Sequence, residues 1–102
     1  PKGSIESYGD ISAQTRSVLN NIKGTLTKLG LTFGDVVQAH VYMTPDPSKN
    51  GDIDFAGMNK VWLTEFGTPG QPNKPSRVTV KVAGLAAPGA LIEIEITAAK
   101  KK

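Results

Sequence analysis

The chain has 102 residues and a formal net charge of +3, a length that suits one small domain rather than two. It contains no cysteine and a single histidine, which excludes disulfides, thiolate nucleophiles and cysteine-based or histidine-rich metal sites. No apolar run in the sequence approaches the roughly 20 residues that a membrane-spanning helix needs.

A first helix is expected after an irregular lead-in over residues 1–9. Asp10 is a favourable N-cap residue, and Gly30 is suited to end the helix. Between them, mainly apolar side chains recur at helical spacing, which predicts one buried face. The members of that face are Ile11, Thr15, Val18, Ile22, Leu26 and Leu29.

The segment VVQAHVYMT, residues 36–44, alternates as a β-strand does. The pattern assigns an apolar face to Val37, Ala39, Val41 and Met43 and a second face to Val36, Gln38, His40 and Tyr42. We interpret His40 as a packing or interface residue rather than as a general base.

A second helix is expected to begin near Asp52 or Asp54, after turn residues over 45–51. Its buried stripe comprises Phe55, Met58, Trp62 and Phe66. Gly67 should stop this helix, and the proline-rich segment over residues 68–75 has no periodicity and is interpreted as a loop.

Two alternating segments follow, over residues 77–82 and 91–98. The pattern predicts that Val78, Val80, Val82, Ile92, Ile94 and Ile96 are buried, and that Arg77, Thr79, Lys81, Glu93, Glu95 and Thr97 face the other way. With a turn around residues 85–90, an antiparallel hairpin is expected, which places Arg77 opposite Thr97 and Lys81 opposite Glu93. The element order is then α-β-α-β-β.

Arg77 lies where a strand leaves a long loop, a position at which functional sites are common. A guanidinium group is well shaped to hold a carboxylate by two parallel hydrogen bonds. A carboxylate within reach could act on a proton or orient a water molecule. The pattern therefore indicates a small-molecule site, although charges such as those of Lys81 and Glu93 also occur on solvated sheet faces, and that interpretation stays open.

Four segments resemble the YjgF/RidA family, in order and over nearly the whole chain from about residue 9. They are GDISAQTRSVLNNIKGTLTKLGLTFGDVVQAHVYMT (9–44), DFAGMNKVW (54–62), PSRVTVKVAGL (75–85) and GALIEIEITA (89–98). The resemblance implies a single domain over residues 1–102 of the α/β (α+β) class with the chorismate-mutase-like fold, a mixed sheet with two helices packed on one face. It also implies a homotrimer with clefts between its subunits.

The function implied by the resemblance is the hydrolytic deamination of reactive enamines and imines, such as 2-iminobutanoate and 2-iminopropanoate, to 2-keto acids and ammonia. No metal and no cofactor is implied. The arginine of the family's PAR motif, which holds the substrate carboxylate, matches Arg77. The first glutamate of its EIE motif, which positions the attacking water, matches Glu93, and Thr79 and Asn59 match positions at the substrate.

Three departures from the family pattern bear on the site. Ser76 replaces the usual alanine, and the turn LAAPGA (85–90) is one residue longer than usual, so that Glu95 rather than Glu93 could position the water. The family's N-terminal β-hairpin, which lines the cleft, has no match in this sequence. We therefore expect a longer functional protein that includes the hairpin, with a reduced natural variant as the alternative.

Two other functions remain open within the same family. One is non-catalytic binding of small carboxylates or protection of other proteins, and the other is the ribonuclease activity proposed for some members. Three of the positive charges are Lys100, Lys101 and Lys102, in a lysine-rich tail over residues 99–102, so the charge distribution does not favour a nucleic-acid partner. The expected compartment is cytoplasmic or mitochondrial, which the sequence does not resolve.

Overall fold

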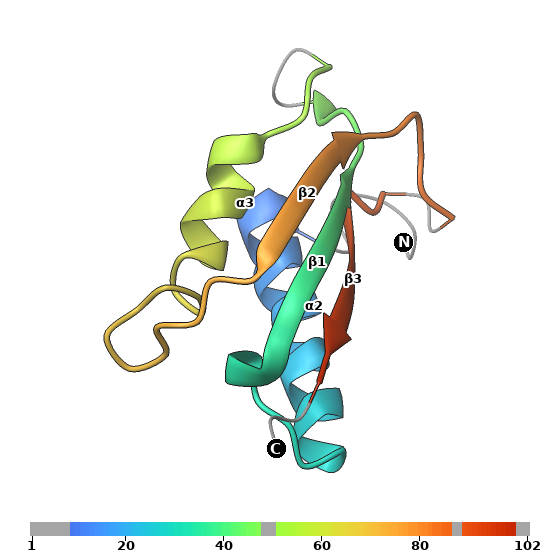
Figure 1. Ribbon diagram of the computed structural model, residues 1–102. Helices are drawn as coiled ribbons and strands as arrows, with labels where there is room; N and C mark the ends of the chain where they lie inside the picture. Colours follow the sequence, from blue (N-terminus) through green and yellow to red (C-terminus); the bar gives the residue numbers. More distant parts are fainter. Residues whose placement is uncertain (1–8, 48–50, 87–88, 100–102) are drawn as a thin grey trace.

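The computed structural model describes residues 9–47, 51–86 and 89–99. Its elements are α2 (Ile11–Lys28), the 3-10 turn η1 (Phe33–Asp35), β1 (Val36–Met43), α3 (Phe55–Trp62), β2 (Ser76–Lys81) and β3 (Ile92–Ala98) (Figure 1). The expected α-β-α-β-β order and the mixed α+β class are confirmed. The lead-in over residues 1–8 and the lysines at 100–102 lie outside the described residues.

The sheet has the strand order β2-β1-β3, with β1 in the centre. β2 runs parallel to β1 and β3 runs antiparallel to it. The expected hairpin between the last two strands is therefore wrong. Because α3 connects β1 to β2, the chain makes a β-α-β crossover that sets the two strands side by side in parallel, and β3 takes the other free edge of β1.

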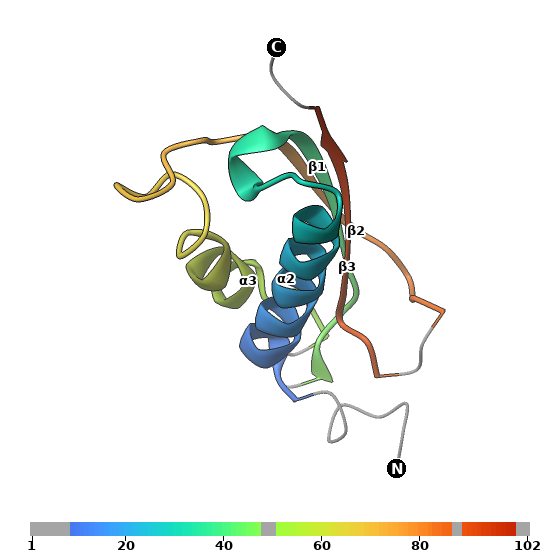
Figure 2. The same ribbon diagram turned by 90° about the horizontal axis from the view of Figure 1, so that it is seen from below.

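Both helices lie on the same side of the sheet (Figure 2). Asp10 caps α2 by accepting a hydrogen bond from the Ala13 amide, and Gly30 follows the helix with a positive φ of 75°. Most of the expected α2 stripe is buried or half-buried, but Leu29 is exposed because the helix ends one residue before it. The core fills the space between the helices and the inner face of the sheet.

Gln14 is a buried polar residue of α2 that sequence reasoning missed. Its Nε2 donates to the carbonyls of Gly9 and Gly89 over 2.9 and 3.1 Å. Its Oε1 accepts from the Leu91 amide over 2.7 Å. This one side chain ties the start of α2 to the segment that leads into β3.

The two faces of β1 follow the expected alternation except at its first two residues. Val36 is 1% exposed and Val37 is 52% exposed, the reverse of the expectation. A shift in the β1–β3 register between Val36 and Gln38 accounts for this, because an extra residue in one strand moves the following side chains to the other face.

Helix α3 begins after its N-cap Asp54, as expected, but ends at Trp62. Phe66 is nonetheless buried, in the turn beyond the helix, where its ring stacks on Trp62 with centroids 4.4 Å apart. Phe55, expected in the buried stripe, is 43% exposed. Gly67, with a φ of 71°, follows the turn.

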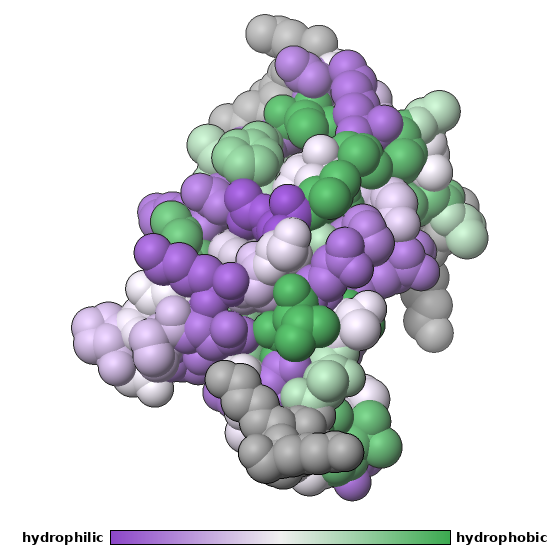
Figure 3. All heavy atoms as spheres, in the orientation of Figure 1, coloured by the Kyte–Doolittle hydropathy of each residue, from purple (hydrophilic) through white to green (hydrophobic). Residues whose placement is uncertain are grey.

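The faces of β2 are the reverse of the expectation. Val78 and Val80 are 45% and 37% exposed, while Arg77 faces α3. The register explains the reversal, because Arg77 lies beside the core residue Ala39 and Val78 lies beside His40, and paired residues point to the same face of a sheet. Hydrophobic and hydrophilic side chains are consequently intermixed over the strands in Figure 3.

Candidate functional site

Arg77 is the second residue of β2, and its guanidinium group contacts α3. Its Nη1 donates to Oδ1 of Asn59 over 2.9 Å. Its guanidinium carbon lies 5.3 Å from the ring centroid of Phe55 and 5.0 Å from that of Trp62, distances typical of cation–π contacts. Partial burial lowers the pKa of Arg77 from its usual value because it removes water from the charged form.

No carboxylate in the described part of the chain pairs with Arg77. The ion pairs found among these residues join Arg16 to Glu65 and Lys81 to Asp52. The guanidinium group of Arg77 therefore interacts with one amide oxygen and the faces of two aromatic rings. Several guanidinium N–H groups remain available to a ligand.

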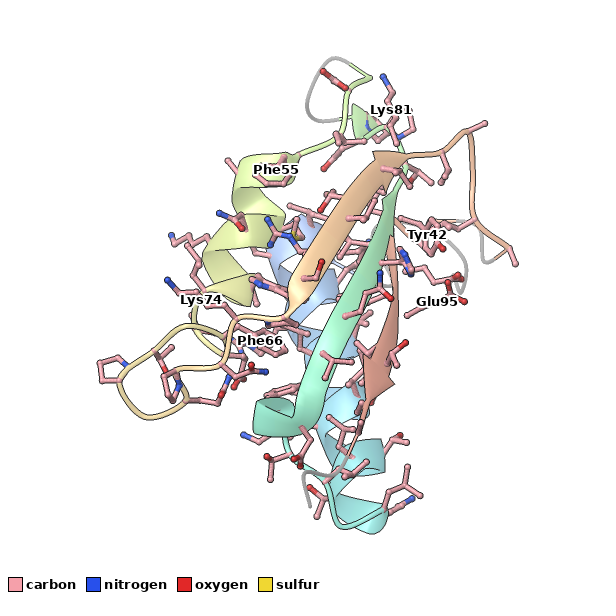
Figure 4. The ribbon with its side chains drawn as sticks, in the orientation of Figure 1. Tyr42, Phe55, Phe66, Lys74, Lys81 and Glu95 are labelled. Atoms are coloured by element: carbon pink, nitrogen blue, oxygen red, sulfur yellow. The ribbon has the colours of Figure 1, made fainter. Side chains whose placement is uncertain are left out.

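A pocket of about 260 Å³ opens beside the guanidinium, between α3 and the edge strand β2. Its walls include Asn59, Trp62, Phe66, Lys74, Pro75 and Arg77. Figure 4 shows Phe66 and Lys74 on this side of the molecule, well away from Tyr42 and Glu95. The combination of two cationic side chains, an amide and an apolar floor suits a small anionic ligand.

The loop over residues 67–75 owes its shape to Gln71, which sequence reasoning missed. The Gln71 Nε2 donates to the carbonyls of Glu65 and Asn73 over 2.9 and 3.3 Å. Its Oε1 accepts from the Asn73 amide over 2.9 Å. A glutamine among prolines and glycines was the only sequence signal for this role.

Asn73 fastens the same loop to the start of β1. Its Nδ2 donates to the carbonyls of Phe33 and Val36 over 3.0 and 2.8 Å. Lys74 and the first residues of β2 follow directly, so these bonds fix the backbone that carries one wall of the pocket. The sequence did not indicate this role, because it depends on contacts with residues far away in the chain.

Thr79 lies on the same side of β2, two residues beyond Arg77. It does not line the pocket beside Arg77. Its Oγ1 is the one buried side-chain nitrogen or oxygen atom among the described residues that has no hydrogen-bond partner. An unsatisfied buried hydroxyl group is unfavourable by about 1–3 kcal/mol.

Glu93 and Glu95 lie on the outer face of the sheet, away from the helices. The register places Glu93 beside Tyr42 and Glu95 beside His40. The Tyr42 hydroxyl donates to Oε1 of Glu95 over 2.8 Å, and mainly this hydrogen bond raises the pKa of Tyr42. No hydrogen bond to the Glu93 carboxylate is found within the described residues.

The structure thus brings Arg77 and Asn59 together but does not bring Arg77 and Glu93 together within one chain. Arg77 lies beside the core residue Ala39 on the helix side of the sheet, whereas Glu93 points from the outer face. The expected pairing of Arg77 with Thr97 is wrong because β1 separates β2 from β3.

The same topology corrects the expected pairing of Lys81 with Glu93. Lys81 lies beside Met43 in the sheet, and its Nζ is 3.2 Å from Oδ1 of Asp52 in the segment before α3. Both side chains are largely exposed, so the pair contributes about 0–1 kcal/mol to stability.

A second pocket, of about 400 Å³, lies between α2 and β3 and has no titratable side chain in its walls. Within the three described ranges, no group of three or more histidine, aspartate or glutamate residues is placed to hold a metal ion. None of the helices in these ranges is long and apolar enough to cross a bilayer. The pocket beside Arg77, unlike the one between α2 and β3, has charged side chains in its walls that can bind an anionic ligand.

Comparison with protein families gives a match over residues 1–100 to the family model described as Endoribonuclease L-PSP. The chain is 43% identical to a RutC family protein of Pyrococcus horikoshii over 94 residues, which are 91% of this chain and 65% of that protein. A RutC family protein of Haemophilus influenzae is 38% identical, with the same 65% share covered. The chain thus spans 65% of the length of these relatives, which is just under two thirds.

Solved structures give the same result for the fold. The Escherichia coli protein TdcF, crystallised with bound serine, has a TM-score of 0.76 and 31% identity over 91% of this chain and 67% of its own. The YjgF gene product of Escherichia coli has a TM-score of 0.75 and 32% identity, and the match covers 91% of this chain and 67% of that protein.

Proposed function

The chain belongs to the YjgF/RidA family, whose model is described as Endoribonuclease L-PSP, and on this premise we propose that it binds a small carboxylate at Arg77 and hydrolyses 2-imino acids. The substrates are molecules such as 2-iminobutanoate and 2-iminopropanoate, and the products are 2-keto acids and ammonia. The observation that carries the proposal is the half-buried Arg77 guanidinium, which faces a pocket and has no carboxylate partner among the described residues.

Arg77 is oriented for this role before any ligand arrives. Asn59 holds one nitrogen of the guanidinium, and the rings of Phe55 and Trp62 lie against the group. A carboxylate that binds two of the remaining N–H groups in parallel is held in one plane. Because a fixed substrate converts an encounter into an oriented reaction, this clamp lowers part of the barrier to hydrolysis.

Hydrolysis adds water to the C=N carbon and then releases ammonia, so a group must position the water and move its proton. We assign this role to Glu93, as the family pattern implies. Its carboxylate accepts no hydrogen bond from the described residues, whereas that of Glu95 is occupied by Tyr42. This difference favours Glu93 over Glu95.

Arg77 and Glu93 lie on opposite sides of the sheet in one chain, so the proposed reaction needs more than one copy. The proposed oligomer is a homotrimer in which the Glu93 side chain of one copy reaches the Arg77 pocket of another copy. The outer face of the sheet supports association, because the partly exposed Val78 and Val80 would be covered by a neighbouring copy.

A second candidate is binding of small carboxylates without turnover, which the serine complex of the TdcF relative favours. The test that separates the two is hydrolysis of 2-iminobutanoate generated in situ. The wild type should turn it over, and Arg77→Lys, which keeps the charge but loses the planar fork, should lose at least about tenfold in kcat/KM.

Arg16→Lys is the matched control, since Arg16 pairs with Glu65 and does not line the pocket. It should retain wild-type turnover. Carboxylate binding that depends on Arg77 without turnover would favour the second candidate. RNA cleavage that Arg77→Lys leaves unchanged, with no imine turnover, would contradict the proposal.

A further inference from the structure

The pocket beside Arg77 contains a second cation, the side chain of Lys74. We propose that this pocket selects dicarboxylates, namely 2-imino or 2-keto acids that carry a second carboxylate at the far end, with Arg77 on one carboxylate and Lys74 on the other. The proposal rests on the carboxylate binding at Arg77 proposed above and adds the class of substrate.

Lys74 is held in place along its stem by the turn after α3. The amide of Gly67 donates to the carbonyl of Asn73 over 3.0 Å, which brings the two ends of the loop together. A Cβ atom at Gly67 would lie 2.8 Å from Cε and 3.1 Å from Cγ of Lys74. The aliphatic stem therefore lies against the glycine, and its charged end extends from a supported position.

The ammonium group of Lys74 has no acidic partner among the described residues. Glu65, the acid in the turn after α3, is already paired with Arg16 over 2.8 Å. The same Arg16 also donates to the Thr64 hydroxyl over 2.6 Å, which further fixes the pair. Asp35 lines a separate pocket together with Lys74, but its carboxylate accepts the Thr32 amide and forms no ion pair with Lys74. The ammonium group of Lys74 is therefore without an ion-pair partner among the described residues.

Two uncompensated cations on one small pocket repel each other. A ligand with one carboxylate compensates one of them, whereas a ligand with two compensates both. The difference in binding free energy between the two ligands is therefore set by the number of carboxylates, which is a charge-based form of selectivity.

The apolar walls fit the middle of such a ligand. Trp62, Phe66 and Pro75 line the same pocket as the two cations, and Figure 4 shows Lys74 close to Phe66 near the start of β2. An aliphatic chain packs on these surfaces while its charged ends bind the cations. The volume of about 260 Å³ suits a small metabolite rather than a polymer.

The test compares 2-oxoglutarate with 2-oxopentanoate, which share a carbon skeleton and differ only in the distal carboxylate. Trp62 is the single tryptophan of the chain and lines the pocket, so its fluorescence reports binding directly. We expect 2-oxoglutarate to bind up to about fivefold more tightly, since an exposed charge pair contributes up to about 1 kcal/mol. This preference should weaken at high salt.

Lys74→Met, which keeps the stem against Gly67, should lower the affinity for 2-oxoglutarate about fivefold and leave 2-oxopentanoate within about twofold. Lys60→Met is the control, because Lys60 is an exposed residue of α3 that does not line the pocket. Equal affinities for the two ligands, or equal losses for both in Lys74→Met, would overturn the dicarboxylate proposal. Absence of binding by either ligand, or binding that Arg77→Lys leaves unchanged, would instead contradict the proposed function itself.

Discussion

The guanidinium of Arg77 donates a 2.9 Å hydrogen bond to the amide oxygen of Asn59, which joins the edge strand β2 to helix α3. The partner of Arg77 is thus a neutral amide. A carboxylate in its place would have neutralised the guanidinium charge. A neutral partner orients the guanidinium and leaves its charge for a ligand. This relationship links the fold to the proposed site.

Replacing the amide by a carboxylate should close the site. In Asn59→Asp, Arg77 gains an internal ion pair of nearly unchanged shape, so we expect stability to rise by up to about 1 kcal/mol. Affinity for 2-keto acids should fall at least about tenfold, because the new carboxylate competes with the ligand. Urea unfolding and titration by Trp62 fluorescence measure the two effects, and undiminished ligand affinity in this variant would count against the clamp role of Arg77.

Removal of the unsatisfied hydroxyl of Thr79 should stabilise the protein. Thr79→Val keeps the shape of the side chain and deletes the buried Oγ1 that lacks a partner, so a gain of about 1 kcal/mol is expected. The control is Thr97→Val, at an exposed position of β3, which should change stability little. Urea unfolding provides the measurement, and a loss of stability in Thr79→Val would show that the hydroxyl group has a partner in solution.

The loop beside the pocket should depend on one asparagine. Asn73→Ala removes the hydrogen bonds to the carbonyls of Phe33 and Val36, and we expect a loss of about 1–3 kcal/mol together with weaker ligand binding. Asn20→Ala, at an exposed position of α2, should cause no loss. Denaturant unfolding monitored by Trp62 fluorescence checks both variants, and equal stability of the two would exclude an anchoring role for Asn73.

Tyr42 should titrate at a higher pH than an ordinary tyrosine, because its hydrogen bond to Glu95 favours the neutral phenol. The pKa is raised above the usual value of 10.0 on folding, so the linked stability is present below that pH and is lost as pH rises through the folded value. Tyrosinate absorbance in a Tyr8→Phe background isolates this titration.

In that background, Glu95→Ala should bring the pKa of Tyr42 back toward its usual value. Glu93→Ala should have a smaller effect, since Glu93 acts only through its charge. An unchanged titration in Glu95→Ala would mean that the hydrogen bond is absent in solution.

Two inactive variants should restore activity when they are combined. Arg77→Lys and Glu93→Gln should each lose most imine hydrolysis, with Glu95→Gln much less affected. If Arg77 and Glu93 act across an interface, mixed oligomers refolded together contain some sites with both native residues and regain part of the turnover. Light scattering should show a trimer, and a stable monomer with full activity would contradict this arrangement.

Sequence reasoning succeeded where the determining interactions are local. The Asp10 and Asp54 caps and the order of the elements follow from residues close together in the chain. The faces of β3 were also predicted correctly, because Ile94 and Ile96 alternate with exposed residues and pack against the core. Short-range periodicity is sufficient for such features.

The candidate site was predicted only in part. Arg77 was selected from the sequence for its residue type and its place at the end of a loop, and Asn59 came from the family resemblance; the structure places the two in contact. Lys74 and Asn73 were missed. Their roles depend on the packing of the loop against α3 and β1, and no local pattern records such long-range contacts.

The tertiary structure alone decided which strands are neighbours and which face of β2 is buried. The alternating valines of β2 predicted that the valine face is buried. The parallel register with β1 instead points Arg77 toward the helices and leaves Val78 partly exposed. Alternation specifies that a strand has two faces, whereas pairing with a neighbouring strand decides which face meets the core. The residues of the chain therefore determined its elements, and long-range pairing in the folded sheet placed Arg77 in the pocket and Glu93 on the outer face.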